Sequence, residues 1–549
     1  MKRIVGLVAA AAMVAAGGVG TSGAVASAES AARVAPARAP GPDPVVWGSC
    51  AKEKPALVPA VAGSLKVAPP EEEAAPGVEC ATVRVPLDYH DPWGQTVKVA
   101  INRIKGSVSR DANHLGTLFV NPGGPGASGK ELAQYVSAAM PPKLAARFDV
   151  IGFDPRGVGD SQPALHCVDP KQYFAAPRPD AVARNATEEA ALLTRARDYA
   201  SRCGDMWAWF LPHLTTENAA RDIDTIRAAL GEQQISYLGY SYGTYLGAAY
   251  ATLFPQRLKR LVLDSTVDPT TVWYQANLEQ NTAFDRRHRE FLAWVARNHA
   301  VYKLGNTAKQ ASFAWYSMRN RLRERPAGGK VGPSELDDVF TLGGYSDLVW
   351  PQLAGAWSSY VRKGDTKGLL AAYKQHAEVD ATDENGYAVY LAVECRDAAW
   401  PRDWNTWRAD MSKMHRVAPF MTWPNAWYNA PCAFWSVQSG SPMRIQGTTK
   451  LPPILMLQSK RDAATPYEGA RTMRKLFPTA RMVTDPGGNH GISLGGNRCV
   501  DGYLTAYLTD ASVPRDLTAC AARPAPRAAQ KMASDGQHGH ERLTELLAR

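Results

Sequence analysis

Two patterns of apolar positions alternate along residues 80–265. Short apolar runs typical of strands are separated by longer segments with helical spacing. Residues 216–230 predict an amphipathic helix with Ile223, Ile226 and Leu230 on one face, capped by Thr215 or Thr216 and ended by Gly231. The pattern predicts an α/β fold with a mostly parallel sheet. The expected strands are 79–86, 96–104, 116–121, 148–153, 235–238, 258–264, 453–458 and 481–485.

Residues 270–448 interrupt this alternation with a mainly helical pattern. They hold 11 of the 15 tryptophans, which we interpret as core residues rather than ligand contacts. The simplest organisation is a helical cap inserted into the sheet domain, with the chain returning to the sheet at Leu451. We therefore expect a first core segment at 46–269, a cap at 270–448 and a second core segment at 449–520.

The two ends of the chain differ from the rest. Lys2 and Arg3 precede an apolar run and an Ala-x-Ala sequence, which predicts a secretory signal peptide over 1–28, cut after Ala26 or Ala28. A membrane anchor would need ~20 apolar residues, more than this run supplies, so we expect no stable membrane association. Residues 29–45 are Ala- and Pro-rich and predict a disordered leader or the propeptide of a zymogen. The tail 521–549 is expected to be flexible, with His538 and His540 solvated rather than metal-bound.

Composition narrows the class of protein. The 549 residues are 45% hydrophobic and 21% charged, which excludes a disordered chain, a collagen-like repeat and a small disulfide scaffold. The net charge of +10 is scattered. The densest basic stretches, 286–289 and 319–325, lack the interleaved aromatics of a nucleic-acid groove, so we expect no nucleic-acid partner.

All cysteines follow the predicted signal peptide, and none forms a C-x-x-C pair, so the sequence predicts neither a zinc site nor a thioredoxin-like site. An even number of cysteines in a secreted chain predicts disulfides. Eight cysteines allow 105 pairings, among which we expect neighbours along the chain to pair. The cysteines are Cys50, Cys80, Cys167, Cys203, Cys395, Cys432, Cys499 and Cys520.

Gly239-Tyr240-Ser241-Tyr242-Gly243 carries the strongest chemical signal. The motif follows a predicted strand and runs into a predicted helix, which is the context of a nucleophile elbow. A second G-x-S-x-G match at Ser493 has no strand directly before it and no helix after it, and the sequence around Ser346 lacks the last glycine. We therefore expect Ser241 to be a catalytic nucleophile.

A nucleophilic serine needs a base and an acid that orients the base. His490 lies in a glycine-rich loop after the last strand, where parallel sheets place functional groups, whereas His213, His299 and His376 lack this setting. Asp462 ends the preceding strand and fits the order Ser, Asp, His along the chain. Asp264, at the end of an earlier strand, is the alternative acid.

Residues 121–126, with the sequence NPGGPG, follow an early strand and contain three glycines. Such a loop can direct backbone amides at a developing oxyanion. The expected pair of donors is the Gly124 amide and the Tyr242 amide that follows the nucleophile.

These motifs together resemble a known family. NPGGPG (121–126), FDPRGVGDS (153–161), GYSYG (239–243), RDAATPYEGA (461–470) and GGNHG (487–491) are similar to the proline-iminopeptidase-like branch of the α/β-hydrolases. The likeness to secreted tripeptidyl aminopeptidases of filamentous Gram-positive bacteria extends from about Trp47 to Cys520. Simpler iminopeptidases begin the oxyanion loop with histidine where this chain has Asn121, so their single-residue specificity is not carried over.

The resemblance implies a secreted serine exopeptidase that removes tripeptides from free N-termini, with Ser241 as nucleophile, His490 as base and Asp462 as acid. Such an enzyme needs no metal or organic cofactor, and its partners are peptides or proteins with a free N-terminus. We expect a monomer. A secreted carboxylesterase or lipase is the alternative, because one triad serves both bonds. A non-catalytic hydrolase-fold binding protein is a third reading.

An exopeptidase must also hold the substrate ammonium. An ammonium removed from water needs a carboxylate partner. Glu394 and Asp397 in the predicted cap flank Arg396 beside Cys395 and are the candidates, although both carboxylates could simply be solvated.

Overall fold

The computed structural model describes residues 42–50, 77–110, 113–521, 523–528 and 535–548. The predicted signal peptide and most of the predicted leader lie outside these residues. The described residues contain no helix that is both long enough and apolar enough to cross a membrane.

A ten-stranded sheet forms the core, in the order β1-β2-β3-β5-β4-β6-β7-β8-β9-β10. The pairings from β1 to β5 are antiparallel and all pairings from β5 onward to β10 are parallel. The mostly parallel sheet predicted from the alternating pattern is confirmed. The strands are β1 (Gly48–Ser49), β2 (Val78–Pro86), β3 (Thr96–Ile104), β4 (Gly116–Asn121), β5 (Phe148–Asp154), β6 (Ile235–Tyr240), β7 (Leu258–Asp264), β8 (Ile454–Ser459), β9 (Ala480–Asp485) and β10 (Thr518–Ala519).

The two faces of the sheet bury alternate residues of the same strands, as the period of two requires. Leu118 and Val120 of β4 pack with α1 and α17, whereas Phe119 between them packs with α5 and α6 on the other face. The core helices are α1 (Gly129–Ala139), α2 (Pro142–Ala145), α5 (Thr216–Ala229), α6 (Tyr242–Leu253), α16 (Tyr467–Leu476), α17 (Arg498–Asp510) and α18 (Asp535–Ala548). Helix α5 begins at the predicted residue, where Thr215 is its N-cap.

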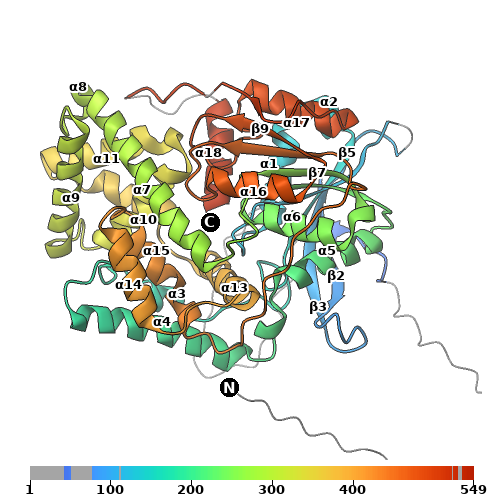
Figure 1. Cartoon of the computed structure of the whole chain (residues 1–549), viewed down its shortest axis with the longest axis horizontal. Helices are drawn as coiled ribbons and strands as arrows, with labels where there is room; N and C mark the ends of the chain where they lie inside the picture. The colour runs from blue at the N-terminus through green and yellow to red at the C-terminus, as the bar shows by residue number, and fades with distance from the viewer. Residues whose placement is uncertain (1–41, 51–76, 111–112, 522, 529–534, 549) are drawn as a thin grey trace, which may run out of the picture. The chain divides into compact units, whose positions relative to one another are not determined.

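The inserted segment between β7 and β8 is a layer of helices (Figure 1). Apolar residues of 283–373 form a core of their own, whereas most of those in 387–435 pack with the core of the sheet domain. Buried tryptophans dominate the core of 283–373, including Trp315 and Trp357, which are fully enclosed. Its helices are α7 (Tyr274–Arg297), α8 (His299–Tyr302), α9 (Ala308–Glu324), α10 (Pro333–Tyr345), α11 (Trp350–Lys363), α12 (Lys367–His376), α13 (Ala381–Asp397), α14 (Trp404–His415) and α15 (Thr422–Asn429).

The cap also contains a segment that we did not expect there. Helices α3 (Pro170–Tyr173) and α4 (Ala186–Trp207), between β5 and β6, lie beside the cap helices (Figure 1). Asp180 pairs with the Arg319 guanidinium at 2.7 Å, and Glu189 accepts a hydrogen bond from the Trp404 indole at 2.7 Å. The cap is therefore built from two stretches of the chain, which the core residues 216–264 separate.

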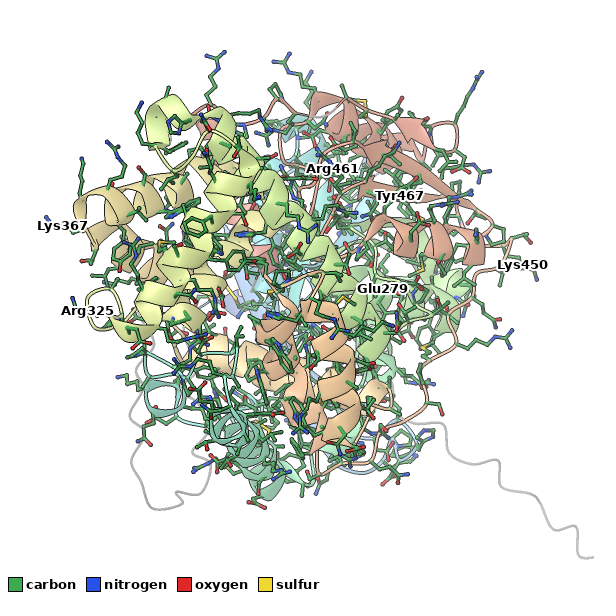
Figure 2. All side chains as sticks on the ribbon, turned by 60° about the vertical axis from the view of Figure 1, so that its left-hand side comes forward. Glu279, Arg325, Lys367, Lys450, Arg461 and Tyr467 are labelled. Carbon is green, nitrogen blue, oxygen red and sulfur yellow. A yellow bond between two sulfur atoms is a disulfide. The ribbon has the colours of Figure 1, made fainter. Side chains whose placement is uncertain are left out.

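Charged side chains are spread over the surface. Figure 2 shows Arg325 and Lys367 at the outer edge of the cap, Lys450 at the outer edge of the core, and Glu279 between them.

The disulfides join Cys50–Cys80, Cys167–Cys203, Cys395–Cys432 and Cys499–Cys520, which are the neighbouring pairs expected from the sequence.

The tail differs from the flexible segment that we expected, because residues 535–548 form helix α18. Leu543, Leu546 and Leu547 are buried in the apolar layer that α1 and α17 form on the sheet. A Cβ at Gly491 would overlap Leu547, so the helix lies directly against the loop that carries His490.

Replacing Leu547 by alanine should lower the free energy of unfolding by about 2–4 kcal/mol, because a buried leucine leaves a cavity when it is shortened. Thermal unfolding followed by circular dichroism would measure the effect, with Val417→Ala on the exposed surface as the control. Equal melting temperatures for the two variants would show that α18 is not part of the cooperative fold.

Candidate active site

Ser241 lies at the turn between β6 and α6, at the carboxyl edge of the sheet. Its φ of 55° and ψ of −129° are strained for a residue with a side chain. A Cβ at Gly239 would collide with the Gly243 carbonyl, and a Cβ at Gly243 would lie 2.6 Å from the Asn121 carbonyl oxygen. Both flanking glycines are therefore required for a turn this tight, which is the geometry of a nucleophile elbow.

Asp462 and His490 meet at the same edge, after β8 and β9. His490 Nδ1 lies 2.9 Å from Asp462 Oδ2 and 3.0 Å from Oδ1, and both side chains are buried. Asp462 also accepts the Ala464 and Thr465 amides, each at 3.0 Å, and the Thr465 hydroxyl at 2.9 Å. A carboxylate that only accepts holds the histidine proton on Nδ1. Nε2 is thereby left unprotonated.

His490 Nε2 is buried and has no hydrogen-bond partner within the described part of the chain. The backbone fixes the ring, because the His490 amide donates to the Tyr345 carbonyl at 2.8 Å. The Tyr345 ring also meets the imidazole edge to face, with centroids 5.4 Å apart. A rigid ring with an open acceptor nitrogen is suited to act as a general base.

Asp264, the alternative acid, has different partners. Its carboxylate accepts the Ile492 amide at 3.1 Å, the Ser493 amide at 2.7 Å and the Ser493 hydroxyl at 2.5 Å. Burial raises its pKa to about 6. Its backbone carbonyl accepts the Ser241 amide at 3.1 Å. Asp264 therefore links the elbow to the loop after His490, and Ser493 is held in that link rather than presented as a nucleophile.

The loop 121–126 packs directly against the elbow. Gly123, Gly124 and Gly126 have φ values of 108°, 99° and 108°, which glycine adopts readily. A Cβ at Gly123 would lie 2.9 Å from Ser241 Cβ and from the Tyr242 amide nitrogen. The loop therefore lies in direct contact with Ser241 and with the first residue of α6.

The cap reaches the same loop through α13, where a Cβ at Gly126 would collide with the Gly386 carbonyl. The same helix carries Glu394 and Asp397, both buried. Glu394 Oε2 has no hydrogen-bond partner among the described residues. Burial raises the pKa of this carboxyl well above its usual range, while Tyr390 and Asn277, which face it, act in the opposite direction. Both carboxylate oxygens of Asp397 instead accept hydrogen bonds from Thr216, one from the amide at 3.0 Å and one from the hydroxyl at 2.5 Å.

Sequence reasoning missed three residues of this region: Tyr345, Thr465 and Thr216. Each contacts a triad or elbow residue, Tyr345 from the end of α10, Thr465 from the loop after β8 and Thr216 from the start of α5. No local motif identifies such positions. In the described part of the chain no group of three or more His, Cys, Asp or Glu side chains could hold a metal ion. The side chains of His538 and His540 lie outside that part.

Known proteins match most of the chain. A family model described as alpha/beta hydrolase fold covers residues 116–496. The tripeptidyl aminopeptidase of Streptomyces coelicolor is 44% identical over 459 residues, 82% of this chain and 84% of the relative. Serine protease Hip1 of Mycobacterium tuberculosis is 32% identical over 470 residues, 82% of this chain and 89% of the relative.

A third relative has a name of a different kind. Carboxylesterase B of Mycobacterium tuberculosis is 33% identical over 460 residues, which are 80% of this chain and 86% of the relative. The elbow, the sheet order and these matches agree, and the chain belongs to the α/β-hydrolase family, among relatives that include the tripeptidyl aminopeptidases of Streptomyces.

Proposed function

We propose that the chain is a secreted serine exopeptidase that releases tripeptides from free N-termini, with Ser241, His490 and Asp462 as its catalytic triad. The observation that carries this proposal is the His490–Asp462 pair, which leaves an open Nε2 at the edge where the strained Ser241 lies. The tripeptidyl aminopeptidases of Streptomyces, at 44% identity, support the substrate class.

The chemistry follows from these groups. His490 Nε2 takes the Ser241 proton as the serine oxygen attacks the scissile carbonyl, and Asp462 stabilises the imidazolium that forms. The Gly124 and Tyr242 amides donate to the oxyanion. The imidazolium then protonates the leaving amine, and a water molecule activated by His490 releases the tripeptide from Ser241.

A carboxylesterase would use the same triad, and the name of one relative favours this second candidate. The two functions separate on substrate. We expect a tripeptide p-nitroanilide with a free amine to be cleaved with a higher kcat/KM than p-nitrophenyl acetate. Turnover of the ester alone would favour the esterase, and a triad this complete argues against a protein that only binds.

The amine anchor in this proposal is Glu394. A buried carboxylate oxygen without a partner is costly, and a substrate ammonium would supply both the hydrogen bond and the opposite charge. Helix α13 also contacts the oxyanion loop at Gly126, so the cap can act as a wall beside the loop that packs on Ser241. Asp397 is left out of the anchor, because Thr216 occupies its oxygens.

Glu394→Gln should raise KM for free-amine peptides by about 10- to 100-fold, since a hydrogen bond to a charged group contributes ~1.5–3 kcal/mol. Lowering the pH through the raised pKa of Glu394 protonates and neutralises this carboxyl. The KM for the same peptides should therefore rise in the unmodified protein and not in Glu394→Gln. Steady-state kinetics would measure both effects. Glu324→Gln, the same change at an exposed cap residue, is the control. A KM unchanged by Glu394→Gln would remove the anchor and leave the triad intact.

Secretion and processing belong to the same proposal. The signal-peptide pattern over 1–28 motivates export, and four disulfides fit an oxidising destination. We propose that residues 29–45 are a leader removed on maturation. N-terminal sequencing of protein recovered from culture medium tests both steps.

A further inference from the structure

Two hydrogen bonds join the buried side chains of Asp397 in the cap, Thr216, and Tyr242, the residue after Ser241. The Thr216 hydroxyl lies 2.5 Å from Asp397 Oδ2 and 2.7 Å from the Tyr242 phenol oxygen. Asp397 ends the cap helix α13, Thr216 begins the core helix α5 and Tyr242 begins α6. These hydrogen bonds therefore link one cap helix to the N-termini of two core helices.

The direction of these hydrogen bonds is determined by the carboxylate. Burial raises the pKa of Asp397 to about 6, and in its ionised form the carboxylate can only accept. The Thr216 hydroxyl must then donate to Asp397, and its oxygen accepts the Tyr242 O–H. The Thr216 amide, which has no acceptor within its own helix, also donates to Asp397.

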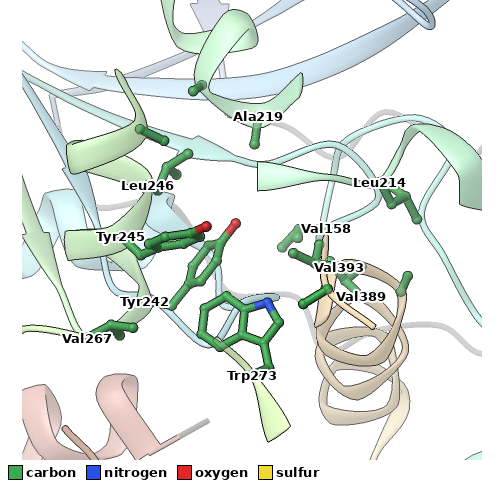
Figure 3. Packing of buried hydrophobic residues seen from close by; sticks show 14 of the residues in the cluster. Val158, Leu214, Ala219, Tyr242, Tyr245, Leu246, Val267, Trp273, Val389 and Val393 are labelled. Atoms are coloured by element: carbon green, nitrogen blue, oxygen red, sulfur yellow. The ribbon is translucent and has the colours of Figure 1, made fainter. Parts of the chain in front are cut away.

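The Tyr242 ring is buried in the apolar core, and its phenol makes a hydrogen bond to Thr216. It packs beside Tyr245 and Trp273, with centroids 6.3 and 5.9 Å away, and faces Val389 and Val393 of α13 (Figure 3). Apolar contacts fix the volume that the ring fills but have no preferred bond angle, whereas a hydrogen bond weakens steeply with angle. The phenol bond is thus the directional constraint on the side chain of Tyr242.

We propose that Asp397 and Thr216 are positioning residues that hold the Tyr242 amide in line with the oxyanion, acting through the Tyr242 phenol. The inference rests on the proposed function, in which this amide is an oxyanion donor. A strained elbow needs such support, because Ser241 at φ 55° persists only if the surrounding structure imposes it. Glu394 and Asp397 lie one turn apart on α13, so the helix that binds the amine also aligns the oxyanion donor.

The chain offers a matched pair of variants for the test. Tyr242→Phe removes the phenol that donates to Thr216. Tyr245→Phe removes a buried phenol that has no hydrogen-bond partner among the described residues, next to the same Trp273 ring. We expect Tyr242→Phe to lower kcat about tenfold with KM within about twofold, a part of the ~10²–10³-fold cost of losing a whole oxyanion donor. Tyr245→Phe should leave kcat unchanged.

Both variants should be measured on a tripeptide p-nitroanilide and on p-nitrophenyl acetate, because both reactions form an oxyanion. Thr216→Val should reproduce the loss, Thr216→Ser should restore kcat, and Tyr242→Phe combined with Thr216→Val should be no worse than either change alone. Equal kcat for Tyr242→Phe and Tyr245→Phe in an active protein would overturn the inference alone, even if Tyr242→Phe melts earlier. An unmodified protein inert toward both substrates would overturn the proposed function itself.

Discussion

Ser241→Ala should abolish hydrolysis of peptides and esters alike, with a loss on the order of 10⁶-fold in kcat, the size seen when a triad serine is removed. Ser241 lies at a strained strand–helix turn beside the loop 121–126. The protein should still fold, because the hydroxyl is not a cap of α6. A fluorophosphonate probe followed by peptide mapping should label Ser241 in the parent protein and nothing in the variant.

Ser493→Ala is the control for this experiment, since Ser493 lies in the second G-x-S-x-G match. Its hydroxyl donates to Asp264, so the change should lower the melting temperature while the phosphonate still labels Ser241. Labelling at Ser493, or retained turnover in Ser241→Ala, would contradict the assignment of the nucleophile.

Asp462→Asn should lower kcat by about 10⁴-fold, the cost of an imidazole held in the wrong tautomer. Asparagine can present an N–H to His490 Nδ1, which would force the proton to Nε2 and remove the base. The loss should appear in kcat for peptide and ester substrates, because both depend on the same proton transfer. Steady-state kinetics on protein with a native circular dichroism spectrum would measure it.

Asp264→Asn separates the two candidate acids. Its carboxylate holds the Ile492 and Ser493 amides, so the variant should lose stability and keep kcat within about tenfold. If Asp264→Asn lost several orders of magnitude on folded protein while Asp462→Asn stayed active, the acid would belong to β7 instead of β8.

The parts of the site that local sequence determines could be predicted. The elbow depends on neighbours along the chain, namely a strand, two glycines and a helix, and β6 differs from the expected strand only by extending to Tyr240. His490 and Asp462 follow consecutive parallel strands, so their meeting follows from the topology. The fold class could be predicted for the same reason.

Other features depend on contacts between distant residues. Arg178 and Glu335 pair across 157 positions, and no local pattern reveals that the segment before α4 belongs to the cap. The leucines of α18 follow an Ala- and Pro-rich stretch. Because that composition is typical of flexible segments, the helix was predicted as part of a flexible tail. Asp397 has the composition of an amine anchor, yet the start of α5 takes its hydrogen bonds.

Mass spectrometry of one defined peptide shows directly whether the protein releases tripeptides from a free N-terminus. A synthetic peptide of twelve residues, with a free or an acetylated N-terminus, would be incubated with the mature protein and with Ser241→Ala. We expect successive loss of tripeptides from the free-amine peptide, no cleavage of the acetylated peptide, and no products from the variant. Equal cleavage of the free and acetylated peptides, or release of a unit of another length, would contradict this expectation.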